Sequence, residues 1–309
     1  MQKNLRVDVR GARSTDELLA AAGPQFNFAV EARPALFADG LGGVREGVGQ
    51  MIVRTDTLQP LALVGDRYVP AQVQDFVAPL DRFLRDGLLI PVSASVFDFG
   101  LTRAIELQLP QPIVLPGPSG TEDVLLRRVI WRDNLDGSAS AALIDSLLRR
   151  WCANGAAHVL GMLSQTFRHT LNRMAELRDL CLDGAVTAAT ERFARVETNA
   201  RRLLAAPFTV GEMLTVAREL YPDTEAGTAT VYAGKARMAM VELFQRGAGN
   251  VGATAWDAAN AVTEWSTHHR PVRGQDPKLS RLRAIWLGDA QAQRGIEAVA
   301  RVAGVDLAN

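Results

Sequence analysis

The first part of the chain changes from helical to strand periodicity. Ser14 supplies a hydroxyl before Asp16 and Glu17, an apolar run follows, and Gly23 closes it, which predicts a short helix over residues 14–23. Short apolar or alternating runs bounded by Gly, Pro and Asp then predict strands at residues 26–31, 49–54 and 60–64. Residues 65–69 predict a hairpin turn that leads into a further strand.

Helical spacing returns in the next segment. Val73, Phe76, Leu80 and Leu84 recur three or four residues apart, and Gly87 predicts the end of a helix over residues 72–85. Further strands are predicted at residues 89–92, 93–99, 103–109 and 124–131, with a Pro- and Gly-rich connection before the last of them. From Ser138 onward the period is helical almost to the end of the chain.

Together these patterns predict an α+β fold. A sheet-rich N-terminal half, residues 1–137, should hold nearly all the strands, between about residues 26 and 131. A mainly helical C-terminal half, residues 138–309, should follow and pack on the first as one compact unit.

Composition narrows the class of protein. The 309 residues are 48% hydrophobic, which excludes a disordered or collagen-like chain, and no apolar run approaches the length of a membrane span. The N-terminus has no continuous apolar core and does not resemble a secretory signal. Cys152 and Cys181 are too few for a disulfide framework or a four-ligand zinc site, so we expect both to be reduced, separate and metal-free. These features predict a soluble protein of the cytoplasm.

The charges add a candidate site. The net charge is zero, but residues 126–205 carry 12 basic and 8 acidic groups, the largest basic excess along the chain. Of the 34 basic residues 31 are arginines, which suit bidentate phosphate contacts but also follow from a GC-rich genome. If the chain binds nucleic acid, seven arginines of this block should line one surface near the predicted strand-to-helix junction: Arg127, Arg128, Arg132, Arg149, Arg150, Arg168 and Arg173.

Other polar segments could bind a metal or act in catalysis, but each also has a simpler structural interpretation. Asp133, Asn134 and Asp136 could chelate a metal, but Asp136-Gly137 also makes a turn and Ser138 or Ser140 can cap a following helix. Cys152 and His158 lie six apart on opposite sides of a helix, so they form no local nucleophile–base pair. His268 and His269 suit the end of a helix that Thr254 caps. No motif of a known enzyme class appears in a fitting context, and no cofactor is predicted.

An ordered series of short motifs resembles a known family. The motifs are Ser14-Thr15-Asp16-Glu17-Leu18-Leu19, Val53-Arg54-Thr55-Asp56, Leu63-Val64-Gly65-Asp66-Arg67-Tyr68, Asp136-Gly137-Ser138, Cys152-Ala153-Asn154, Arg168-His169-Thr170 and Trp256-Asp257-Ala258-Ala259-Asn260-Ala261-Val262-Thr263-Glu264. In this order they resemble the phage/plasmid-like proteins of the domain of unknown function nine-three-two family. The resemblance implies a mobile-element protein of the bacterial cytoplasm and brings no established activity.

Three functions remain open from the sequence. The first is non-enzymatic nucleic-acid binding in phage or plasmid DNA metabolism, for example single-strand annealing or recombination by a homo-oligomer, with single-stranded DNA as the partner. The second is a protein-interaction module, such as a phage regulator or an inhibitor of host defence. The third is a metal-dependent hydrolase that uses Asp133, Asp136 and a histidine such as His169.

Overall fold

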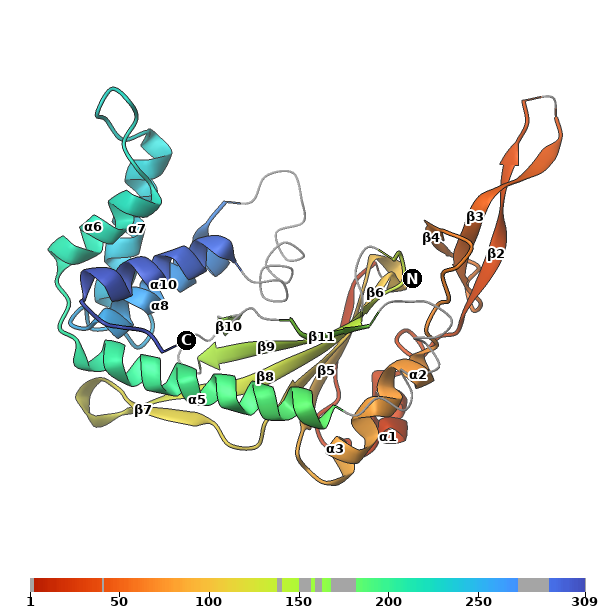
Figure 1. Ribbon diagram of the computed structural model, residues 1–309, viewed down its shortest axis with the longest axis horizontal. Coiled ribbons are helices and arrows are strands. Elements are labelled where there is room, and N and C mark those ends of the chain that lie inside the picture. Colours follow the sequence, from red (N-terminus) through yellow and green to blue (C-terminus); the bar gives the residue numbers. More distant parts are fainter. Residues whose placement is uncertain are drawn as a thin grey trace. The chain divides into compact units, whose positions relative to one another are not determined.

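The computed structural model describes residues 3–40, 42–137, 141–149, 157–158, 163–167, 182–271 and 289–308. Figure 1 shows the elements in sequence colours. The strands are β1 (Leu5–Asp8), β2 (Val30–Ala38), β3 (Val44–Arg54), β4 (Pro60–Val64), β5 (Ile90–Phe97), β6 (Thr102–Gln108), β7 (Ile113–Pro116), β8 (Glu122–Asn134), β9 (Ala141–Arg149), β10 (Ala157–His158) and β11 (Leu163–Phe167). The helices are α1 (Thr15–Ala22), α2 (Val73–Val77), α3 (Asp81–Arg85), α5 (Asp183–Ala205), α6 (Val210–Leu220), α7 (Val231–Arg246), α8 (Ala255–Glu264) and α10 (Ala290–Val302).

The chain divides into two compact units. Unit 1 takes Met1–Pro110, Arg128–Ile144 and Leu163–Ala188, and unit 2 takes Gln111–Arg127, Asp145–Met162 and Ala189–Asn309. Because the segments alternate, β8, β9 and α5 each contribute residues to both units.

Unit 1 is built on an antiparallel sheet. β1, β5, β6 and β8 lie side by side in that order, with β9 next to β8. A second antiparallel sheet has the order β2-β3-β4. The Trp131 ring of β8 stacks on Phe76 of α2 with centroids 5.6 Å apart, and its indole nitrogen donates to the Phe76 carbonyl at 2.6 Å. This contact fixes the short helices against the main sheet.

Unit 2 is mainly helical. α6, α7, α8 and α10 pack on one another around buried residues such as Met213, Met240 and Phe244. A Cβ on Gly295 would stand 2.1 Å from the Val262 side chain, so α10 and α8 cross too closely for any larger residue. Capping boxes begin two of the helices: Thr209 with Glu212 at α6 and Thr254 with Asp257 at α8.

Several sequence predictions are confirmed. Strands dominate the N-terminal half and helices the C-terminal half. Ser14 caps α1 by accepting from the Glu17 amide, and Gly23 follows the helix with a positive φ of 73°. The predicted helix over residues 72–85 consists of α2, a 3₁₀ turn over Ala78–Leu80 and α3.

Other predictions are wrong at the level of single elements. Residues 141–149 form strand β9 instead of the start of a helix, and β10 and β11 follow it, so strands extend beyond residue 138. β1 lies before residue 26, β7 forms within the predicted Pro-rich connection, and the turn at Gly65 leads into a loop rather than a strand. All but one residue of β9 is buried, so its apolar run has no alternation that could distinguish it from a helix.

Among the helices of the described ranges, none is both long and apolar enough to cross a bilayer.

Candidate nucleic-acid interface

Arg149, one of the predicted phosphate contacts, is buried in unit 2. Its side chain is 1% exposed, as is that of Asp123, and the two form an ion pair at 2.7 Å. Its Nε also donates to Asp123, Nη1 donates to the Ala248 carbonyl at 3.1 Å and the Asn250 side-chain oxygen at 2.9 Å, and Nη2 donates to the Gly249 carbonyl at 3.0 Å. The expectation that Arg149 faces a phosphate is therefore wrong in this structure, because all three of its nitrogens hold the protein together.

This buried ion pair also explains one of the family motifs. The indole nitrogen of Trp256, which begins the long motif on α8, donates to Asp123 Oδ2 at 2.9 Å. The Arg149 guanidinium carbon lies 6.0 Å from the centre of the Trp256 ring. Strand β9 and helix α8 of unit 2 thus converge on a single carboxylate, which is a structural role.

Arg132 and Asp133 are buried in unit 1. Arg103 of β6 is paired in register with Asp133 of β8, and the two fully buried side chains form an ion pair at 2.5 Å. Burial lowers the pKa of Arg132, and the negative charges of Asp133 and Asp136 partly offset this shift. Neither Arg132 nor Asp133 presents its side chain to solvent, so the expectation that Arg132 lines a binding surface is wrong.

The same segment holds its polar groups tightly. The Tyr68 hydroxyl donates to the Asn134 carbonyl at 3.2 Å, and burial, followed by the charge of Asp133, raises the pKa of Tyr68 far above its ordinary value. Gly137 takes a positive φ of 70°, as the predicted Asp136-Gly137 turn requires. Within the described ranges no three His, Cys, Asp or Glu side chains gather as a metal site would need.

Arg128 is neutralised within a polar row across the main sheet. Its guanidinium pairs with Glu106 of β6, which also pairs with Arg6 of β1 and accepts from Ser93 of β5 at 3.0 Å. Two arginines thus share one carboxylate. Arg128 is only 14% exposed, whereas Arg6 is half exposed. Arg127 and Arg128 also lie in different units and point to opposite sides of β8.

Arg127 lies in a group of accessible arginines on unit 2. Its Nε donates to the Gln111 carbonyl just before β7, and Arg201 of α5 donates to the Val114 carbonyl of β7 at 3.1 Å, so both reach this segment. Burial lowers the pKa of Arg127, and the nearby charge of Glu197 opposes that shift; Glu197 also pairs with Arg201 at 2.7 Å.

Two further arginines, Arg195 and Arg202, lie on a different side of α5 from Arg201. Arg195 and Arg202 are seven residues apart, which places them two turns along the same side of the helix. Arg202 is exposed and donates to the Asp306 carbonyl at 2.7 Å, and Arg195 is half-buried. We define the arginine cluster as Arg127, Arg195, Arg201 and Arg202. Glu191 and Glu197 of the same helix reduce its positive charge without cancelling it.

Three of these four residues were missed as candidates from the sequence. Arg195, Arg201 and Arg202 belong to the basic block 126–205, but attention fell on the densest pairs, Arg127-Arg128 and Arg149-Arg150. The signal that could have identified Arg195 and Arg202 is their seven-residue spacing, which places them on one side of a helix.

The paired histidines occupy the end of α8, as expected. Residues Trp265–His269 form a π-helical turn, in which His269 stacks on Trp265 and lies 3.6 Å from Glu264. The remaining predicted residues lie outside the described ranges: Arg150, Arg168, Arg173, His169, Cys152 and Cys181.

Comparison of the chain with known protein families tests the resemblance seen in the sequence. The family model for a Domain of unknown function (DUF932) matches residues 60–286, which is most of the chain. No curated protein and no solved structure matches it. The matched range contains β8, β9, the Arg149–Asp123–Trp256 contacts and the π-helical turn. The chain therefore belongs to the DUF932 family.

Proposed function

We propose that this chain is a non-enzymatic nucleic-acid-binding protein of phage or plasmid DNA metabolism, acting in the bacterial cytoplasm. Its partner would be single-stranded DNA, and its role would be strand annealing or recombination. The observation that carries the proposal is the arginine cluster of unit 2, in which Arg127 and Arg201 reach the β7 segment and Arg195 and Arg202 lie on another side of α5. Guanidinium groups suit phosphate oxygens because each can donate two parallel hydrogen bonds.

The cluster predicts how binding would depend on the nucleic acid. Phosphates carry no sequence information, so arginine contacts to them favour binding that is independent of sequence and weakened by salt. The exposed aromatic side chains Phe37 and Tyr232 lie on β2 and α7, whereas β8 and α5 carry the arginine cluster. Base stacking would therefore contribute little there, and the bases would stay free to pair with a second strand.

The test is a binding titration with the full-length chain. Labelled single-stranded and double-stranded oligonucleotides of one sequence are titrated at several salt concentrations, and fluorescence anisotropy reports binding. In the variant with Arg127, Arg195 and Arg201 all changed to alanine, we expect weaker binding to single strands. The salt slope, meaning the slope of the logarithm of the binding constant against the logarithm of the salt concentration, should be flatter by roughly 2, at about 0.7 per lost contact. Unchanged affinity and slope in this variant would overturn the proposal.

A matched control separates local contacts from general charge. Arg10, Arg82 and Arg85 are exposed arginines of unit 1, each paired with an aspartate. Their triple alanine variant removes the same charge and should leave the salt slope close to that of the wild type. Equal losses in both triple variants would indicate a diffuse charge effect rather than an interface.

A second candidate function is a protein-interaction module. The observation that favours it is a group of exposed apolar residues on the β2–β3 hairpin, which includes Leu36, Phe37 and Val44. Capture of one defined host protein by nuclease-treated chain, with no binding of either oligonucleotide, would favour this function over the first.

A further inference from the structure

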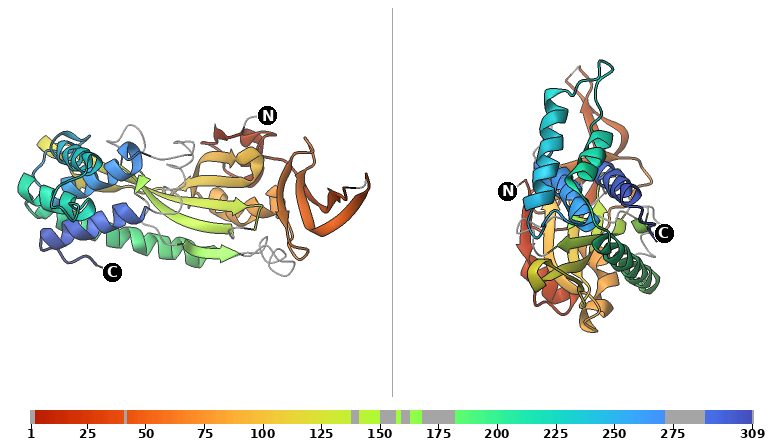
Figure 2. Two further views of the ribbon diagram at one scale, coloured as in Figure 1. Left: turned by 90° about the horizontal axis from the view of Figure 1, so that it is seen from above. Right: turned by 90° about the vertical axis from the view of Figure 1, so that its left-hand side faces the viewer.

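The β2–β3 hairpin, here called the arm, is a long ribbon with few neighbours in unit 1. Its strands have nine and eleven residues, and both views show its tip clear of the other elements of that unit (Figures 1 and 2). Leu36 is 64% exposed and Val44 is 69% exposed. Single exposed apolar residues are ordinary, but a group of them on a ribbon of two strands indicates a contact surface.

Register places these residues on one face. Leu36 is directly opposite Glu46, and Ala38 is opposite Val44, so all four side chains point to the same side of the ribbon. Phe37 and Arg45 form a pair on the other side. One face of the arm is thus apolar with a single acid on it.

The charges of the arm argue against a nucleic-acid partner for that face. Residues 31–50 contain three acids and two arginines, and each arginine is paired with an acid: Arg33 with Glu31 and Arg45 with Asp39. Glu46 makes no ion pair with the described residues and is directly opposite Leu36 in the ribbon. Pro34 lacks an N–H group and interrupts the outer edge of β2, which disfavours addition of another strand there. The apolar face, rather than the strand edge, is therefore the candidate contact surface of the arm.

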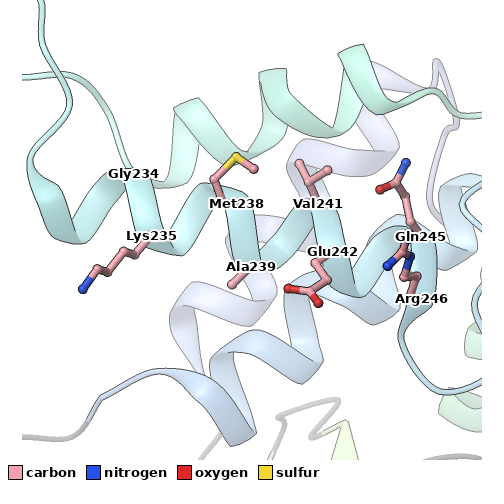
Figure 3. A pocket seen from close by; sticks show the side chains of 8 residues that line it. All are labelled: Gly234, Lys235, Met238, Ala239, Val241, Glu242, Gln245 and Arg246. Carbon is pink, nitrogen blue, oxygen red and sulfur yellow. The ribbon is translucent and has the colours of Figure 1, made fainter.

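A complementary surface lies on α7 of unit 2. Its exposed side forms an open groove of about 630 Å³, which Figure 3 shows with its lining side chains. Met238, 66% exposed, provides the accessible apolar part, whereas Val241 beside it is only 9% exposed, and a Cβ on Gly234 would meet no atom within 4 Å. Lys235 and Arg246 stand toward opposite ends, with Glu242 between them. Within the described ranges, neither cation has a recorded ion pair, and the groove has a net positive charge.

We propose that the apolar face of the arm of one copy docks on the α7 groove of a second copy, so that the chain associates head to tail. The apolar residues of the arm would cover Met238, and Glu46 would pair with Lys235. A flexible methionine adapts well to such a contact. A heterologous contact leaves a free arm at one end and a free groove at the other, so it builds rings or filaments. This proposal is independent of nucleic-acid binding.

The first test is the oligomeric state of the full-length chain without nucleic acid. Sedimentation velocity over a wide concentration range should show concentration-dependent association of the wild type. Leu36→Asp and Met238→Asp should each weaken association on the order of tenfold or more. The control Val251→Asp, at an exposed apolar position on neither surface, should associate like the wild type. A wild type that stays monomeric at every concentration overturns the proposal.

The second test exploits the head-to-tail geometry. The Leu36→Asp chain keeps an intact groove and the Met238→Asp chain keeps an intact arm, so an equimolar mixture should form a one-to-one dimer that neither forms alone. If arms instead paired with arms, Met238→Asp alone would still associate and the mixture would add nothing, which overturns the proposal. Glu46→Lys and Lys235→Glu should each weaken association, and the double variant should recover it. Circular dichroism and thermal unfolding should remain those of the wild type for all variants, since the changed side chains are exposed.

Discussion

Unit 2 contains the same residue type in two opposite settings. Arg149 is almost fully buried and gives its guanidinium nitrogens to Asp123, Asn250 and two loop carbonyls. Arg201 is half exposed and holds one carbonyl and one glutamate on the surface. A count of arginines treats the two alike, but only the second has room for a ligand. The difference shows that burial and partners, rather than local charge density, decide which arginine of a basic block can serve binding.

Replacement of the buried arginine should give the largest loss of stability. Arg149→Ala leaves Asp123 buried with the Trp256 indole as its remaining described donor and removes the anchor of the 248–250 loop. We expect a loss of about 3–5 kcal/mol in the free energy of unfolding, because a buried charge loses its counter-ion. Arg201→Ala, the matched surface change, should stay within about 0.5 kcal/mol. Urea denaturation measures both, and equal losses would contradict the distinction.

The buried pair of unit 1 provides the next test. Asp133→Ala leaves the Arg103 cation without its carboxylate and should cost about 3–5 kcal/mol in unfolding free energy. The rings of Phe28 and Phe76 lie 5.9 and 5.3 Å from the Arg103 guanidinium carbon, so the surroundings suit an apolar replacement. The double variant Arg103→Met, Asp133→Leu should therefore be much more stable than Asp133→Ala alone.

A double-mutant cycle makes this second prediction decisive. The cycle comprises the wild type, Arg103→Met, Asp133→Leu and the double variant, each unfolded by urea. If the two single losses simply add in the double variant, Arg103 and Asp133 do not act as a pair.

The main architecture could be predicted from the sequence because its signals are local. The Ser14 cap, the Gly23 end of α1 and the spacing of the helix over residues 72–85 are each set within a few residues. β9 could not be predicted this way, because a strand buried on both faces has no alternating pattern.

The candidate site was harder to predict for a different reason. Asp123 and Arg149 are 26 residues apart, and Trp256 is 133 residues from Asp123, so nothing local indicates that Arg149 is neutralised. The cross-strand pairing of Arg103 with Asp133 likewise depends on sheet register. The basic excess of residues 126–205 does include the α5 arginines, but charge alone gives them no priority over the buried ones.

Arg192 and Asp145 lie between the two extremes and give the smallest expected effect. Asp145 is fully buried, whereas its partner Arg192 is 18% exposed. Burial raises the pKa of Asp145, and the hydrogen bond from Arg192 opposes that shift without cancelling it. As pH rises above the ordinary value of 3.8, the folded protein therefore keeps a proton that the unfolded chain has lost. The stability that this group contributes therefore falls as pH rises from 3.8 to the raised pKa. Above the raised pKa it no longer depends on pH.

The variant Asp145→Asn removes this titration and isolates its contribution. Apart from a constant offset for the lost ion pair, the variant should gain stability relative to the wild type as pH rises from about 4, by at most roughly 1.4 kcal/mol per pH unit. Asp8 is the matched control with the opposite sign, because the exposed Arg10 beside it lowers its pKa to about 2. Relative to Asp8→Asn, the wild type should gain stability as pH rises from about 2 to 4, and salt should weaken that gain. Chemical denaturation at closely spaced pH values measures both differences. If the Asp145→Asn difference instead moved in the same direction as that of Asp8→Asn, the ion pair with Arg192 would outweigh burial, and Asp145 would be charged in the folded protein like Asp123.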